Sequence, residues 1–71
     1  MLTLDELRAA MRPIHALYGA VVQQRNMISA LKQCGMRPPA DPGGGVAAYN
    51  EVLIAAISNE IRRRETYFSE V

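Results

Sequence analysis

The sequence has little of what small domains use to reinforce a core: it contains one cysteine, one histidine and no tryptophan in 71 residues. A single cysteine cannot form an internal disulfide, and one histidine with one cysteine cannot build a structural zinc site. A chain of this size buries only about 60% of the surface that its unfolded form exposes. It usually needs a cross-link, a metal or a partner chain to be stable. We therefore expect a homodimer that completes its core by self-association, without a metal or other cofactor.

The chain also lacks an excess of one charge and a long apolar run. Eight Lys and Arg face seven Asp and Glu, and a net charge of +1 is too balanced for binding driven by nucleic-acid phosphates. No apolar run approaches the roughly 18 residues of a membrane span, so we expect no membrane partner. Residues 1–6 show no basic region followed by an apolar stretch, so no secretion signal is expected. A lone, reduced Cys34 then favours the cytoplasm.

An apolar stripe at helical spacing predicts a first helix over about residues 4–34. Thr3 and Glu6 indicate its start, because each side chain can bond to the other's backbone amide in a capping box. Pro13 interrupts the pattern, because proline removes a donor and clashes with the carbonyl four residues back. We expect a kink there, or a short helix followed by a longer one starting near Pro13. The stripe itself consists of Leu4, Leu7, Met11, Ile14, Tyr18, Val21 and Ile28, widened by Leu17 and Leu31.

A glycine marks the predicted end of this helix. Gly35 is the expected C′ residue, with Met36 folding back on Leu31 in a Schellman motif. Residues 36–45 contain six Pro or Gly and no periodicity, so they form a connector. The glycines at 43–45 lack the preceding strand and the following Lys of a phosphate loop, and we interpret them as a hinge.

A second stripe predicts a helix over about residues 46–68. Residues 52–57 are apolar on almost every face, and a two-helix hairpin cannot bury a helix on all sides. We therefore predict an all-α fold in one domain, residues 1–71, formed by a two-helix antiparallel hairpin that dimerises into a four-helix bundle. The residues that we expect to form the dimer core are Leu53, Ile57, Ile61 and Phe68.

The run Arg62–Arg64 is the strongest indication of nucleic-acid binding in the sequence. Glu60 and Glu65 flank the run, and no aromatic residues alternate with its arginines. Consecutive helix residues also point in different directions, so the run is not a single patch. We interpret it as a solvated helix face and keep a nucleic-acid-binding helical dimer as an alternative. His15 has no second metal-binding residue within a turn and is expected to be a packed or surface residue.

Part of the chain resembles the all-helical chorismate mutases. Leu4-x-x-Leu7-Arg8, followed by Arg25 and a helix ending in Lys32, is similar to the opening helix of that family. The helix that contains Ile57, Glu60, Ile61 and Glu65 is similar to its final helix. The resemblance implies that Arg8 and Arg25 clamp carboxylates and that Glu65 lies near the breaking bond. Pro42–Gly45 stands where the family's middle helix should begin, so the resemblance covers the first and last helices only.

The function that we expect from the sequence is a non-enzymatic one. Residues 52–57 suggest a helical protein that dimerises and binds or inhibits another protein, through a surface that includes Arg25, Arg37 and Tyr49. Small, alanine-rich helical proteins of this kind are often phage-encoded inhibitors of host machinery or regulatory adaptors. The alternative from the family resemblance is a reduced mutase-like protein that binds an aromatic-pathway carboxylate through Arg8 and Arg25.

Overall fold

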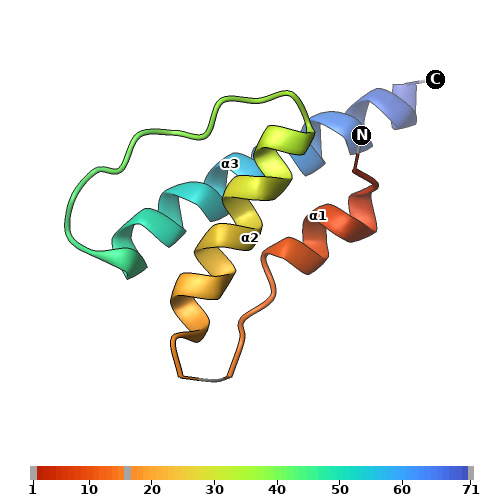
Figure 1. The fold of residues 1–71 in the computed structure, drawn as a ribbon. Helices are drawn as coiled ribbons and strands as arrows, with labels where there is room; N and C mark the ends of the chain where they lie inside the picture. Colours follow the sequence, from red (N-terminus) through yellow and green to blue (C-terminus); the bar gives the residue numbers. More distant parts are fainter. Residues whose placement is uncertain (1, 16, 71) are drawn as a thin grey trace.

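Three helices form the described part of the chain. The computed structural model describes residues 2–15 and 17–70, with side chains up to residue 67. Within these residues the elements are α1 (Leu4–Ala10), α2 (Gly19–Gln33) and α3 (Val46–Glu70), and there is no strand (Figure 1). The predicted all-α class is confirmed, and the last helix begins at the predicted residue.

The start of α1 has the predicted capping box. The Thr3 amide donates to Oε1 of Glu6 at 3.0 Å, and the Glu6 amide donates to Oγ1 of Thr3 at 3.1 Å. These two bonds satisfy two amides that have no partner inside the helix. The hydrogen bond from the Thr3 amide also holds the pKa of the Glu6 carboxyl below its ordinary value.

The predicted helix over residues 4–34 is in fact two helices. Its first part ends at Ala10, and α2 does not begin near Pro13 but at Gly19. Pro13 has no amide to donate and disfavours helical backbone at the residue before it, which ends α1. Gly19 packs so closely against the returning chain that a Cβ atom there would lie 2.0 Å from the carbonyl oxygen of Ile14. The predicted helix is therefore divided into two helices rather than kinked at Pro13.

The end of α2 forms the predicted Schellman motif. Gly35 has a φ of +76°, which favours glycine, and its amide donates to the carbonyl of Lys32 at 2.9 Å. The Met36 amide donates to the carbonyl of Leu31 at 3.0 Å. Met36 packs against the edge of the core, as this motif requires.

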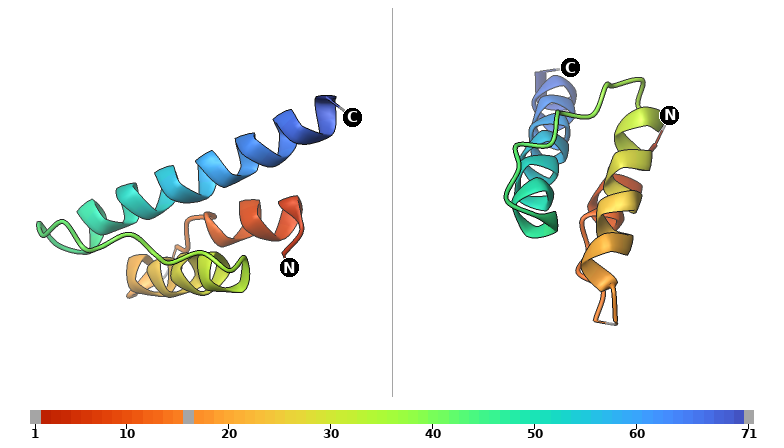
Figure 2. Two further views of the ribbon diagram at one scale, coloured as in Figure 1. Left: turned by 90° about the horizontal axis from the view of Figure 1, so that it is seen from above. Right: turned by 60° about the vertical axis from the view of Figure 1, so that its left-hand side comes forward.

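The direction of α3 differs from the predicted antiparallel hairpin. Near the starts of both helices, Nδ2 of Asn50 in α3 donates to the carbonyl of Ala20 in α2 at 3.0 Å. Farther along both helices, Nη2 of Arg64 donates to Sγ of Cys34 at 3.3 Å. The two helices thus run in the same general direction, and the connector after α2 returns along them to the start of α3 (Figure 2). This return is possible because extended backbone spans about 3.3 Å per residue, against 1.5 Å in a helix.

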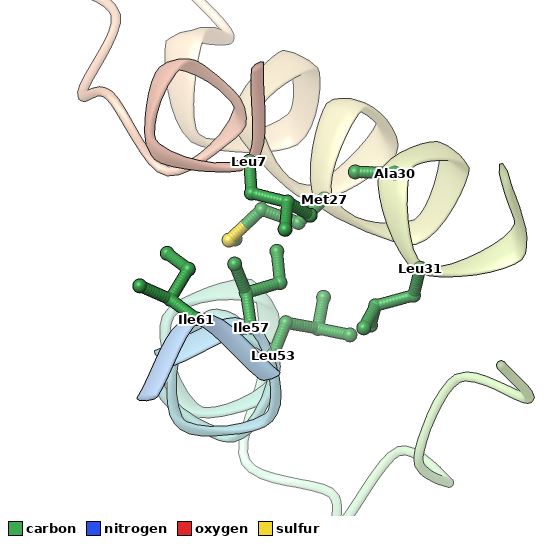
Figure 3. Packing of buried hydrophobic residues seen from close by; sticks show 7 residues of the cluster. All are labelled: Leu7, Met27, Ala30, Leu31, Leu53, Ile57 and Ile61. Atoms are coloured by element: carbon green, nitrogen blue, oxygen red, sulfur yellow. The ribbon is translucent and has the colours of Figure 1, made fainter. Parts of the chain in front are cut away.

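The core lies between α3 and the pair α1 and α2. Figure 3 shows the side chains of α1 and α2 pointing toward those of α3. The predicted dimer-core residues Leu53, Ile57 and Ile61 are buried in this core within a single chain. The side chain of Phe68 lies outside the described residues. A four-helix bundle is therefore not needed to cover the middle of α3. The complete core is Leu7, Met27, Ala30, Leu31, Leu53, Ile57 and Ile61.

Candidate functional site

Exposed apolar side chains gather where α1 is joined to α2. Leu17 is 84% exposed and Tyr18 is 72% exposed, although both have large apolar side chains. This group, which we call the tip, lies at the end of the molecule away from the start of α1 and the end of α3 (Figures 1 and 2). Other exposed large apolar residues, Val46, Ile54 and Tyr67, are spread along α3. The tip consists of Ile14, Leu17, Tyr18, Val21 and Val22.

The backbone of the tip is held in a restricted geometry. Tyr18 has a φ of +65°, which is uncommon for a residue with a side chain. The next residue, Gly19, meets the carbonyl of Ile14 and has no room for a Cβ atom. Nε2 of Gln23 donates to the carbonyl of Met11 at 2.8 Å and ties the first turns of α2 to the end of α1. The exposed side chains of Leu17 and Tyr18 directly precede Gly19 in the chain.

The sequence pattern wrongly assigned tip residues to the buried side of a helix. Ile14, Tyr18 and Val21 belong to the predicted apolar stripe, but all three are exposed. The stripe faces one side only if the helix is continuous, whereas α1 ends at Ala10 and α2 begins at Gly19. Pro13 and Gly19 bracket most of this interruption, and they are the signal in the sequence that could have marked a loop.

The three predicted partner-binding residues lie on three different segments. Arg25 is exposed on α2, just beyond the tip residues Val21 and Val22. Arg37 is exposed in the connector, after the far end of α2. Tyr49 is half-buried, and its hydroxyl donates to the carbonyl of Pro39 at 2.7 Å. Tyr49 thus holds the connector against α3, and only Arg25 adjoins the tip.

The residues implied by the mutase resemblance are brought together in part. Nη2 of Arg8 lies 3.4 Å from Oε2 of Glu65, and its Nη1 lies 3.6 Å from Oδ1 of Asp5. Arg8 therefore pairs with carboxylates of the protein itself. Arg25 is on α2 and forms no ion pair within the part of the chain that the structure describes. A shallow hollow between α1 and α2 is lined by Ala9, Ala10, Asn26 and Ser29 among others, but not by Arg8 or Arg25.

The arginine run has a structural role at one of its three positions. Arg62 and Arg63 are exposed, as predicted for a solvated face, but the side chain of Arg64 is only 11% exposed. The buried carboxylate of Glu60 accepts from Nη2 of Arg63 at 2.6 Å and from Nε of Arg64 at 2.9 Å. The Arg63 hydrogen bond, together with that of Arg64, holds the pKa of Glu60 below its ordinary value. Glu60 thus engages Arg63 and Arg64 within α3, while Arg62 and Arg63 remain exposed.

The remaining polar candidates are isolated from one another. His15 is exposed, and Cys34 is half-buried beside Arg64. Asn50 is buried between α2 and α3, and its Oδ1 has no hydrogen-bond partner within the described residues. Over residues 2–15 and 17–70, no three His, Cys, Asp or Glu side chains group closely enough to hold a metal ion. No helix in these ranges combines the length and apolar character needed to cross a membrane.

Comparison of the chain with protein-family models, with curated proteins and with solved structures found no match. The resemblance to the chorismate mutases therefore stays a prediction from the residues that carry it.

Proposed function

We propose that this chain is a small, non-enzymatic protein–protein interaction module and that the tip is part of its contact surface. The observation that carries the proposal is the exposure of Leu17 and Tyr18 at 84% and 72%, with Tyr18 at a positive φ. Contiguous apolar groups on a small monomer commonly mark an interaction site. Aromatic residues that lose little entropy on binding are frequent anchors of such sites.

The rest of the structure supports this choice of surface. The apolar residues that suggested a partner along α3, such as Leu53 and Ile57, are covered within the chain. The apolar surface that the fold leaves exposed lies mainly at the tip. A protein that covers it would bury side chains that the three helices leave in water. Homodimerisation and inhibition of a partner remain part of the proposal. Light scattering measures the first, and the activity of the captured protein with and without this chain measures the second.

Affinity capture tests the proposed function. Tagged wild-type protein, a Leu17→Ser variant and a Tyr67→Ala control are each exposed to bacterial lysate, and the retained proteins are identified by mass spectrometry. Tyr67 is also exposed, but it lies near the other end of the molecule on α3, so its loss should leave capture unchanged. We expect one stoichiometric protein to be retained by the wild type and by the control but not by Leu17→Ser. Equal capture by all three would exclude the tip as the contact surface.

The mutase-like alternative has a separate test. Millimolar chorismate should leave the melting temperature of the wild-type protein unchanged if Arg8 is engaged by Asp5 and Glu65. A rise that Arg25→Ala abolishes, or formation of prephenate, would instead support a carboxylate-binding site on α1 and α2.

A further inference from the structure

The tip lies in a region of the chain that carries only positive charge. No Asp or Glu occurs between Glu6 and Asp41. Arg12 and Arg25 flank the tip and are exposed, and neither guanidinium forms an ion pair within the described part of the chain. His15 lies within the loop and is also exposed. The apolar surface is therefore bordered by exposed cations that form no ion pair within the described residues.

This charge distribution disfavours a second copy as the occupant of the tip. A two-fold dimer through the tip brings the same patch of both chains together, so the cations that border it on one chain would lie near those of the other. Like charges at a desolvated interface cost free energy, whereas a complementary partner would pair them. The tip is thus suited to a protein of opposite charge rather than to itself.

The backbone at Tyr18 gives a second, independent indication that the tip is a contact surface. A tyrosine at a φ of +65° is disfavoured relative to glycine, and its ring is exposed rather than packed in the core. Strained backbone of this kind concentrates at functional sites. The adjacent Gly19 has no room for a Cβ atom beside Ile14, so the backbone next to Tyr18 is closely packed while the ring is exposed. Restricted backbone lowers the entropy that a contact residue loses on binding.

We propose that the tip binds an acidic protein segment: an apolar groove or helix face, bordered by Asp and Glu, that takes up Leu17 and Tyr18 while its carboxylates pair with Arg12 and Arg25. This inference rests on the proposed function and adds the chemistry of the partner. Apolar burial supplies the affinity of such a complex, and the arginines give it charge specificity.

The experiment is a selection from a display library of random peptides against the immobilised full chain. We expect the enriched peptides to combine apolar residues with an excess of Asp and Glu, and synthetic copies to bind more weakly as salt is raised. Tyr18→Gly should weaken their binding by roughly tenfold or more, as expected for loss of an aromatic anchor. The variant should keep its helical signal, because glycine suits the backbone at this position. Failure to enrich any peptide, or enrichment of peptides without acidic residues, would overturn the proposal.

A charge-reversal pair provides the matched control. Arg25→Glu should weaken the binding of the selected acidic peptides by roughly tenfold. Arg37→Glu makes the same change of charge in the connector beyond the far end of α2, and it should have little effect. Equal weakening by the two variants would show that net charge, and not the tip, governs binding, which contradicts the proposal.

Two further outcomes separate this inference from the proposed function. Suppose that lysate capture depends on Leu17 but the captured protein binds equally well to Arg25→Glu. The proposed interaction module is then supported, and the proposal of an acidic partner is wrong. If the protein sediments with vesicles of phosphatidylserine and phosphatidylcholine through Leu17 and no acidic peptide is enriched, the tip is a lipid-binding element and the proposal is wrong. If capture, selection and vesicle binding all fail, both proposals fall together.

Discussion

Arg64 is hydrogen-bonded to Leu2, which lies 62 positions earlier in the sequence. Its Nη1 donates to the carbonyl of Leu2 at 2.6 Å, while its Nη2 donates to Sγ of Cys34 at 3.3 Å. Its Nε donates to Glu60 on the previous turn of α3. One guanidinium thus joins the segment before α1, the end of α2 and α3. Arginine suits this role because its donors point in several directions in one plane.

Replacing Arg64 should loosen α1 more than the rest of the fold. Arg64→Met keeps most of the apolar stem but leaves the carbonyl of Leu2 without its donor. We expect the free energy of unfolding to fall by about 1–3 kcal/mol. Relative to the wild type, hydrogen exchange in Arg64→Met should accelerate more at the amides of α1 than at those in the middle of α3. Arg62→Met, at an exposed neighbouring position, should change stability by less than about 0.5 kcal/mol. Equal losses in both variants would contradict the role of Arg64.

The Glu60 carboxylate predicts how stability depends on pH. Its pKa is lower in the folded protein than in the unfolded chain, chiefly because Arg63 donates to it. Its contribution is therefore present above about pH 4.5, its ordinary pKa, and is lost as the pH falls through the lower pKa of the folded state. Glu60→Gln should cost about 1–3 kcal/mol at pH 7, since it removes a buried, hydrogen-bonded charge.

Urea unfolding at several pH values tests this prediction. The difference in stability between the wild type and Glu60→Gln should shrink from pH 7 to pH 3. Arg63→Ala serves as a control for the exposed partner, and should cost less stability than Glu60→Gln because its side chain is 71% exposed. A difference between wild type and Glu60→Gln that does not change with pH would show that the carboxylate is not stabilised by folding.

Gly19 should not tolerate any side chain. A Cβ atom would lie 2.0 Å from the carbonyl oxygen of Ile14, so Gly19→Ala must displace the loop. We expect a loss of at least about 2 kcal/mol in thermal or urea unfolding. Gly35→Asn is the matched control, because a Cβ atom there meets open space and asparagine tolerates a positive φ. If Gly19→Ala is as mild as that control, the loop does not approach α2 as described.

Ile57 distinguishes a core within one chain from a core between two chains. Its side chain is fully buried among residues of α1, α2 and α3. Ile57→Asp should therefore remove the helical signal in circular dichroism, because it places an unpaired charge in the core. Ile54→Asp, at a position that is 36% exposed, should remain folded.

Light scattering completes this test by measuring the mass of each folded variant. If the wild type is a dimer and Ile57→Asp is a helical monomer, the result would support the sequence prediction that Leu53, Ile57 and Ile61 join two chains. A wild-type monomer would show that the intrachain core is sufficient.

The features that the sequence predicted correctly are local ones. The capping box of Thr3 and Glu6, the Schellman motif at Gly35 and the start of α3 at Val46 all depend on residues within a few positions of one another. The same is true of the solvated positions Arg62 and Arg63. Arg64 could not be distinguished from them by sequence, because its partners Leu2 and Cys34 are distant in the chain.

The candidate surface was missed for a related reason. Periodicity assigned Ile14, Tyr18 and Val21 to a buried stripe, and it could not show that the helix stops at Ala10 and resumes at Gly19. The predicted partner-binding residue Arg25 does adjoin the tip, whereas Tyr49 is engaged with the connector. A short break of the helix thus changed which apolar residues face water.

The sequence by itself determined the helical class, the ends of helices that carry capping motifs, and the apolar residues of α3 that enter the core. Backbone capping and helical periodicity are short-range effects, so a single chain segment specifies them. Only the tertiary structure decided that α2 and α3 run in the same direction, and that α1 completes the cover of Leu53 and Ile57. The connector is long enough to allow either direction, and contacts between residues distant in the chain, such as that of Asn50 with Ala20, accompany the direction adopted. The same fold leaves Leu17 and Tyr18 exposed to water.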